Sequence, residues 1–168
     1  MRTIGWVTRA YVVGGIVAYG IGCTSGGEDT VSTKLPPPEP VNWEHLSPEE
    51  AKSTLIALGE TVYTQGGTGG VACMTCHMGN GQGIPGVFPP LAGSQEAMGD
   101  CATHARYVLA GLAGEIVVQG KVYRGVMPGQ PMLSDQDIAA VITYERNSWG
   151  NDYGVCLPSI VAKVRASL

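Results

Sequence analysis

The sequence predicts a mainly α-helical domain of three to four helices built around a bound group, on three observations. Three segments with helical spacing of apolar residues begin near positions 47, 100 and 134. Two stretches between them, 65–70 and 79–99, are rich in Gly and Pro. Long loops are uncommon inside a compact domain, and only 7% of the 168 residues are aromatic. We therefore expect a large, flat, apolar group to supply part of the core.

The first helix is predicted from residue 47 to about residue 64. Ser47 and Glu50 form a capping box, with Pro48 at the first helical position. Gly59 lies inside this helix, where Gly costs about 1 kcal/mol relative to Ala. We therefore expect another helix to cross closely at Gly59. The apolar residues recur near a 3.6-residue period: Ala51, Leu55, Leu58 and Val62.

The second half of the chain predicts two further main helices and a hairpin. Residues 100–111 have the spacing of a helix, and Ser134 caps a last main helix that runs to about residue 148. Residues 115–124 predict a small β-hairpin that turns at Gly120 and Lys121. An extension begins at about residue 149, and we expect residues 158–166 to add a short helix.

Residues 73–77 read Cys-Met-Thr-Cys-His, a C-x-x-C-H motif that indicates covalent attachment of haem c. Two thiols at this spacing can each add to a vinyl group of the porphyrin, and the adjacent His then lies under the iron as an axial ligand. The sequence therefore predicts one haem c, bound covalently through Cys73 and Cys76, with His77 as an iron ligand.

Two other uses of a C-x-x-C pair have less support. A thioredoxin-like redox site needs a βαβ setting, and a zinc site needs a second pair of ligands. Neither follows in this sequence, because the remaining His and Cys residues stand far apart: His45, His104, Cys23, Cys101 and Cys156. The sequence has no second C-x-x-C-H motif, and no further His is evident near the other face of a haem.

Residues 1–22 are predicted to be a signal peptide. Arg2 and Arg9 precede a run of 13 uncharged residues, which is shorter than the roughly 20 apolar residues of a membrane span. Cys23 follows small residues, as in a bacterial lipoprotein signal, so Cys23 is the candidate lipidated residue. An uncleaved anchor and simple secretion remain open. Residues 23–42 are predicted to be a Pro-rich linker, and residues 43–168 the single domain.

All three outcomes place the domain outside the cytoplasm, where disulfides persist. We expect it on the periplasmic side of a bacterial cytoplasmic membrane, held there by the lipid anchor. The chain carries a net charge of −4; loss of Arg2 and Arg9 leaves eight basic and 14 acidic side chains, a net charge of −6. Because a negatively charged domain repels phosphate groups, nucleic acid is not expected as a partner.

The order of helix, C-x-x-C-H turn, Pro-containing loop, helix, Met loop and C-terminal helix resembles the class I cytochrome c family over about residues 46–148. More narrowly, Pro-Pro-Leu-Ala-Gly at 89–93, Val-Tyr-Arg-Gly-Val-Met-Pro at 122–128 and Ser-Trp-Gly-Asn at 148–151 resemble membrane-associated mono-haem cytochromes of bacterial respiratory chains. The resemblance implies a class I cytochrome c fold, here with a small β-hairpin insertion and a C-terminal extension.

The same resemblance implies that a Met completes the coordination of the iron. Met127 precedes a Pro shortly before the last main helix, as in the family, and is the predicted sixth ligand; Met132 is the alternative. Either Pro89 or Pro90 would offer its backbone carbonyl to the ring N–H of His77. Of the two, Pro90 is the predicted haem contact.

Two cysteines, Cys101 and Cys156, are not needed for haem attachment. In an oxidising compartment two such cysteines often pair, so a disulfide between them is predicted, with two free thiols as the alternative. Such a bridge would connect the extension to the helix that begins near residue 100.

His/Met ligation leaves no vacant position on the iron, which predicts electron transfer rather than catalysis. We expect a membrane-tethered mono-haem cytochrome that carries single electrons between respiratory complexes or within one. The resemblance implies a membrane respiratory partner, namely an oxidase, alternative complex III or a dehydrogenase. The alternative function is a haem-based peroxidase or a gas-binding cytochrome with a dissociable Met.

Overall fold

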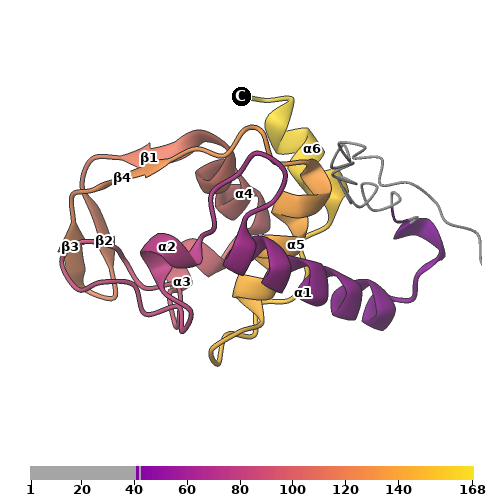
Figure 1. Cartoon of the computed structure of the whole chain (residues 1–168), viewed down its shortest axis with the longest axis horizontal. Coiled ribbons are helices and arrows are strands. Elements are labelled where there is room, and N and C mark those ends of the chain that lie inside the picture. Colours follow the sequence, from indigo (N-terminus) through magenta and orange to yellow (C-terminus); the bar gives the residue numbers. More distant parts are fainter. Residues whose placement is uncertain (1–40, 42) are drawn as a thin grey trace, which may run out of the picture. The chain divides into compact units, whose positions relative to one another are not determined.

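Six α-helices, one 3₁₀-helix and four short strands make up residue 41 and residues 43–168, the part of the chain that the computed structural model describes (Figure 1). Their order is η1 (Trp43–His45), α1 (Pro48–Gln65), α2 (Met74–His77), α3 (Gln95–Met98), α4 (Cys101–Ala110), β1 (Gly111–Ala113), β2 (Ile116–Val118), β3 (Lys121–Tyr123), β4 (Val126–Pro128), α5 (Asp135–Arg146) and α6 (Pro158–Arg165). The predicted mainly α fold class is confirmed. Within these residues, no helix combines the length and the apolar character needed to cross a membrane.

The predictions for the N-terminal part of the chain fall almost entirely outside the described residues. The signal peptide at 1–22, the candidate lipidated Cys23 and the linker at 23–42, apart from residue 41, belong to this part. These assignments stay predictions.

Local capping sets where the main helices begin. The Ser47 hydroxyl accepts from the Glu50 N–H at 3.3 Å, while the Glu50 carboxylate accepts from the Ser47 N–H at 2.9 Å, so the capping box is confirmed. The side chains of Asp100 and Ser134 cap α4 and α5 by accepting from the N–H three residues on, without the reciprocal bond of a capping box. α5 ends at Arg146, two residues earlier than expected.

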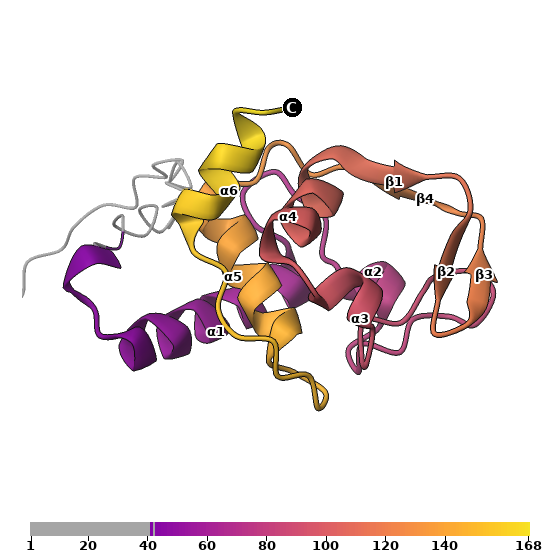
Figure 2. The same cartoon turned by 180° about the vertical axis from the view of Figure 1, so that it is seen from behind.

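The helices α1 and α5 lie against each other, as Figure 1 and Figure 2 both show. A Cβ atom added to Gly59 would lie 2.1 Å from the Ala140 carbonyl oxygen and 2.7 Å from the Tyr144 Cβ. One turn further along α1, the rings of Tyr63 and Tyr144 are 5.4 Å apart. The predicted close crossing at Gly59 is therefore confirmed.

The core lies between α1, α4, α5 and α6. Its fully buried apolar side chains come from all four helices and from the segments that join them. The largest of them are Leu55, Tyr63, Met98, Leu133, Ile138, Val141, Ile142 and Val161.

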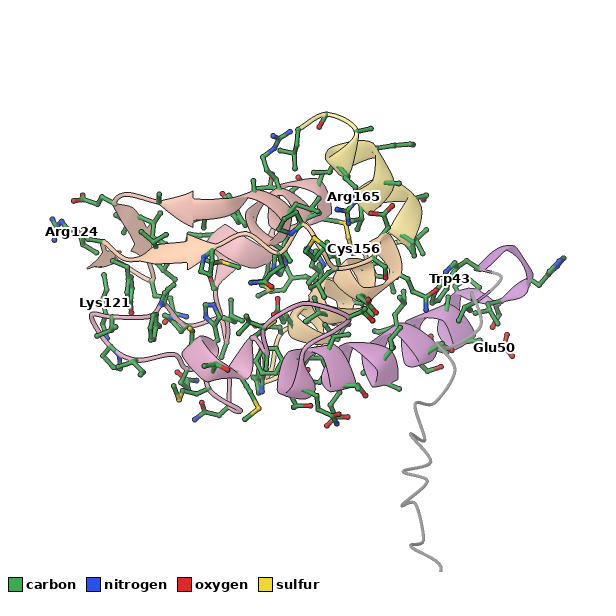
Figure 3. The ribbon with its side chains drawn as sticks, turned by 45° about the horizontal axis from the view of Figure 1, so that its top comes forward. Trp43, Glu50, Lys121, Arg124, Cys156 and Arg165 are labelled. Carbon is green, nitrogen blue, oxygen red and sulfur yellow. A yellow bond between two sulfur atoms is a disulfide. The ribbon has the colours of Figure 1, made fainter. Side chains whose placement is uncertain are left out.

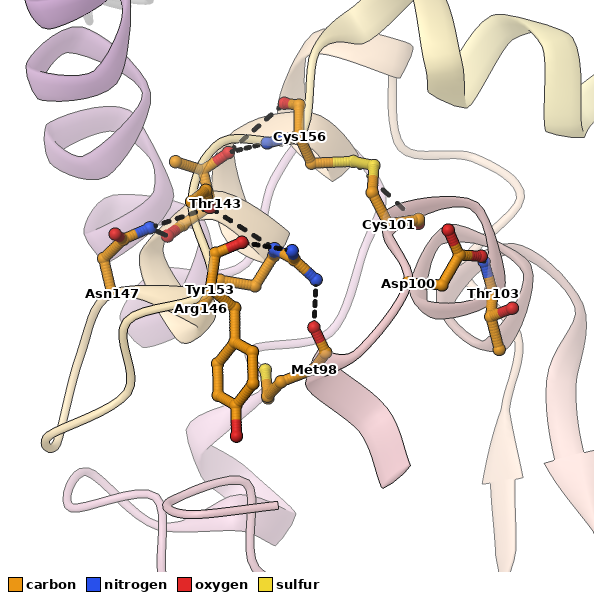
Figure 4. The surroundings of a disulfide bond; sticks show 10 residues. Met98, Asp100, Cys101, Thr103, Thr143, Arg146, Asn147, Tyr153 and Cys156 are labelled. Carbon is orange, nitrogen blue, oxygen red and sulfur yellow. Dashed lines mark hydrogen bonds between the residues drawn. A yellow bond between two sulfur atoms is a disulfide. The ribbon is translucent and has the colours of Figure 1, made fainter. Parts of the chain in front are cut away.

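A disulfide joins Cys101, at the start of α4, to Cys156, which precedes α6 (Figure 4). Sequence alone had left this pair as either a bridge or two thiols. Next to it, the buried guanidinium of Arg146 donates to the carbonyls of Met98 and Tyr153. Both features hold the extension after residue 149 against the helices, so the extension belongs to the domain.

Four strands extend from the helices as two antiparallel pairs, β1 with β4 and β2 with β3. Figure 3 shows Lys121 and Arg124 at the end of the molecule far from Trp43. The predicted hairpin corresponds to β2 and β3, but its turn is formed by Gln119 and Gly120, both with positive φ (49° and 71°). The expected turn at 120–121 was one residue too late. The pairing of β1 with β4 was not predicted.

Candidate functional site

A cavity of about 360 Å³ lies between α2, the loop at 87–91, α4 and the four strands. Its volume is in the range of small-molecule and cofactor pockets. Valines and other apolar side chains form most of its wall, and its polar lining residues include Glu96, His104 and Glu145. The long Gly- and Pro-rich segment at 79–99 thus borders a space, as the sequence predicted for a domain with a bound apolar group, whereas no residue of 65–70 lines it.

The C-x-x-C-H motif lies on the short helix α2 and the residue before it. The His77 N–H donates to the Cys73 carbonyl at 3.0 Å, so Cys73, Cys76 and His77 occupy positions i, i+3 and i+4 of one helical turn. Side chains at this spacing share a face, and all three line the cavity. Both cysteines are free thiols and half-buried. Burial, followed by the nearby Glu145 carboxylate, raises the pKa of the Cys73 thiol well above its usual range.

The ring of His77 is held by the backbone. Its Nδ1 lies 3.0 Å from the Pro89 carbonyl oxygen. A carbonyl only accepts, so Nδ1 carries the proton and Nε2 keeps its lone pair for a metal. The acceptor is therefore the carbonyl of Pro89. Pro90, which was predicted to contact the haem, lines the cavity but does not accept this hydrogen bond. Such a bond fixes the orientation of an imidazole ligand and raises its basicity.

Met127 is the only methionine among the described residues that lines the cavity. It lies on β4, paired in register with Leu112 of β1, which lines the cavity as well. Met132, the alternative ligand, is 75% exposed and does not line the cavity, and Met98 is fully buried in the core.

The structure also places His104 and Glu145 in the cavity wall. Both residues are 3% exposed, and His104 Nε2 lies 2.9 Å from a carboxylate oxygen of Glu145. In the sequence, His104 stands far from the other His and Cys residues, and no partner for it was predicted. A signal was available, because His104 lies one turn before Val108, on the side of the predicted helix that faces inward.

Taken together, these residues fit a haem. Two thiols on one helical turn are spaced for attachment, and His77 has a free Nε2 beside them. Met127 supplies a soft thioether to the same apolar cavity, a ligand type that suits haem iron.

Comparisons with known proteins agree with this geometry. A model of the family described as cytochrome c matches residues 56–149. A cytochrome c-552 of Thermus thermophilus is 40% identical over 97 residues, which are 55% of this chain and 69% of that protein. The cytochrome c subunit of the quinone alcohol dehydrogenase of Gluconobacter oxydans is 36% identical over 98 residues. The corresponding subunit of Gluconacetobacter polyoxogenes is 32% identical over 133 residues. These two matches cover 20% and 28% of the subunits, so the chain spans only a fraction of their length.

Proposed function

Because the chain belongs to the cytochrome c family, we propose that it is a membrane-tethered carrier of single electrons whose haem iron is bound by His77 and Met127. At the level of the family, the chain is an electron-transfer protein with one covalently attached haem c, and it is not an enzyme. Beyond the level of the family, we propose the His77/Met127 ligand pair, the membrane tether and the partner complex.

The ligand assignment rests on the lining of one cavity, which the described residues form with the attachment motif and a single methionine. Cys73 and Cys76 would form the two thioether bonds, and His77 would bind the iron through Nε2 while its Nδ1–H donates to Pro89. Met127 would be the second protein ligand of the iron. A bound haem would supply an iron that changes charge by one electron with little rearrangement. With His77 and Met127 both bound to the iron, no site would be left for a substrate.

The cavity wall supports the same role. Its apolar side chains keep water from the iron, and a low-dielectric surrounding disfavours the extra positive charge of the ferric state. The residues therefore favour a relatively high reduction potential, which suits an electron carrier.

The ligand assignment is tested by Met127→Ala, with Met132→Ala as the matched control. In the haem-loaded full chain, Met127→Ala should abolish the weak red absorption band of the thioether–ferric iron bond and lower the reduction potential, while Met132→Ala should change neither. Retention of the band in Met127→Ala would exclude Met127 as the ligand. If the unaltered ferrous protein binds carbon monoxide readily at neutral pH, the peroxidase or gas-binding alternative gains support instead.

The tether and the partner rest on other features. The lipoprotein-like pattern at Cys23 supports a lipid anchor on the periplasmic side of a bacterial cytoplasmic membrane. The relatives named as cytochrome c subunits of quinone alcohol dehydrogenases support a membrane respiratory complex as partner. Mass spectrometry of the purified protein should show a lipid on Cys23, and an intact Met1 would contradict this. Affinity purification from mild-detergent membranes should recover dehydrogenase or oxidase subunits; recovery of the cytochrome alone would contradict a stable complex.

A further inference from the structure

We propose that His104 and Glu145 form a proton-binding site coupled to the haem: the pair takes up one proton from solvent when the iron accepts one electron, and releases it on oxidation. The inference rests on the proposed function, since the electron is the one that the carrier receives from its donor. It assigns a role to two residues that neither attach the haem nor bind its iron.

The hydrogen bond between the two side chains leaves one defined atom to receive the proton. The Glu145 carboxylate lies 2.9 Å from His104 Nε2. An ionised carboxylate only accepts, so Nε2 carries the hydrogen of this bond and the neutral ring has its lone pair on Nδ1. That Nδ1 is buried and has no hydrogen-bond partner among the residues the structure describes. No donor of the described residues reaches this basic nitrogen, so a proton of its own would satisfy it.

The pair lies where a charge on the haem can be felt. Both side chains line the cavity that contains Cys73 and His77. The negative charge of Glu145 contributes, after burial, to the raised pKa of Cys73 and of Tyr63. Its field therefore reaches the side of the cavity where the haem would be attached.

The sign of the coupling follows from the charges. Without the proton on Nδ1, the pair carries −1, and with it the pair carries no net charge. Reduction lowers the charge of the haem by one, which disfavours the negative form of a neighbouring group and favours its neutral form. Both residues are 3% exposed, and charges interact more strongly in a buried site than in water. Each electron that the haem accepts is thus accompanied by one proton, which binds at His104. The protonated ring and the Glu145 carboxylate then form a buried pair without net charge.

Other titratable or charged side chains surround the pair, and the test must separate them from it. Glu96, Tyr107 and Tyr123 also line the cavity; of these, Glu96 is exposed and accepts from the Gln119 N–H. The other titratable or charged side chains lie on the elements packed around α4 and α5. Each of them is hydrogen-bonded to the backbone, ion-paired, exposed or in contact with another aromatic ring: Glu60, Tyr63, Asp100, Arg106, Tyr144, Arg146, Lys163 and Arg165.

The experiment measures the midpoint potential of the haem-loaded full chain from pH 5 to pH 9 by spectroelectrochemistry. In the unaltered protein the potential should fall with rising pH over part of this range. One proton per electron changes the equilibrium tenfold per pH unit, which corresponds to a limiting slope of about 59 mV per pH unit. Reduction in weakly buffered solution should remove protons from the medium in the same pH range.

Glu145→Gln keeps an acceptor for the Nε2–H of His104 but removes the charge that stabilises a protonated ring. The potential of this variant should be higher and should lose the slope. The double variant His104→Leu/Glu145→Leu replaces the pair with apolar side chains, and it should also lose the slope even if the single variant folds poorly. Glu96→Gln and the exposed Glu60→Gln remove a charge elsewhere and should both keep the slope.

A potential that is flat from pH 5 to pH 9, or a slope that persists unchanged in Glu145→Gln or in the double variant, overturns the coupling. Loss of the slope in Glu96→Gln reassigns the proton to Glu96 and overturns it as well. Haem staining and a reversible one-electron couple, measured on the same samples, separate the two levels of inference. Their absence would refute the proposed function together with this inference, whereas a normal couple with a flat potential refutes the coupling alone.

Discussion

Replacing Gly59 with Ala tests how closely α1 and α5 approach each other. The added Cβ would meet backbone, not a flexible side-chain end: it would lie 2.1 Å from the Ala140 carbonyl oxygen and 2.6 Å from the carbonyl carbon. Reaching even 3.0 Å from the oxygen requires about 0.9 Å of added separation. Because α1 and α5 are packed along the core, the helices must separate as units or bend.

The expected change in stability is the balance of two effects. Overpacking of a well-packed core costs typically 1–3 kcal/mol, and the upper end, about 3 kcal/mol, applies because the obstacle is backbone. Ala is favoured over Gly inside a helix by about 1 kcal/mol. We therefore expect Gly59→Ala to lower the free energy of unfolding by about 2 kcal/mol, whereas helix propensity alone would raise it by about 1 kcal/mol.

Urea unfolding of the haem-loaded protein, followed by circular dichroism, measures this difference. The haem stays covalently attached in the unfolded state, so unfolding is unimolecular, and coincident transitions by circular dichroism and haem absorption check that it is two-state. The matched control is Ala57→Gly, at an exposed position of the same helix, which should lose about 1 kcal/mol. If Gly59→Ala is as stable as the unaltered protein or more so, the close crossing of α1 and α5 is refuted.

Three further predictions concern single bonds. The Tyr63 hydroxyl donates to the Met78 carbonyl at 2.6 Å, so Tyr63→Phe should lower the unfolding free energy by about 1–2 kcal/mol; an unchanged urea midpoint would contradict this. The backbone N–H bonded to the Asp100 carboxylate lowers the pKa of Asp100. The stabilisation that this hydrogen bond gives is thus fully present at pH values above the ordinary pKa of a carboxyl group, and it is lost as the pH falls through the lowered pKa of Asp100. Asp100→Asn, which keeps a capping oxygen, should therefore reduce the loss of stability between pH 7 and acid pH, and an unchanged pH profile would argue against this. Replacing Cys101 and Cys156 with Ser should cost about 2–5 kcal/mol. An unreduced digest should contain their peptides as one linked species, and separate alkylated peptides would exclude the bridge.

The helices and the attachment motif were predictable because the interactions that determine them are local. Ser47, Asp100 and Ser134 each cap a helix through a backbone N–H three residues away. Positions 73, 76 and 77 share a helical face wherever a turn of helix forms. The hairpin was found for the same reason, and its turn was misplaced by one residue because Gln119, without the usual preference for positive φ, adopts it.

Sequence by itself thus determined the haem-attachment turn, the main helices and the family to which the chain belongs. Tertiary structure decided which groups meet across the chain. It selected Pro89 as the acceptor for His77, placed Met127 and not Met132 in the cavity wall, and brought His104 to Glu145, 41 residues away. Such contacts depend on how whole helices and loops pack, which is a sum over many weak, distant interactions, and no spacing within the sequence specifies it.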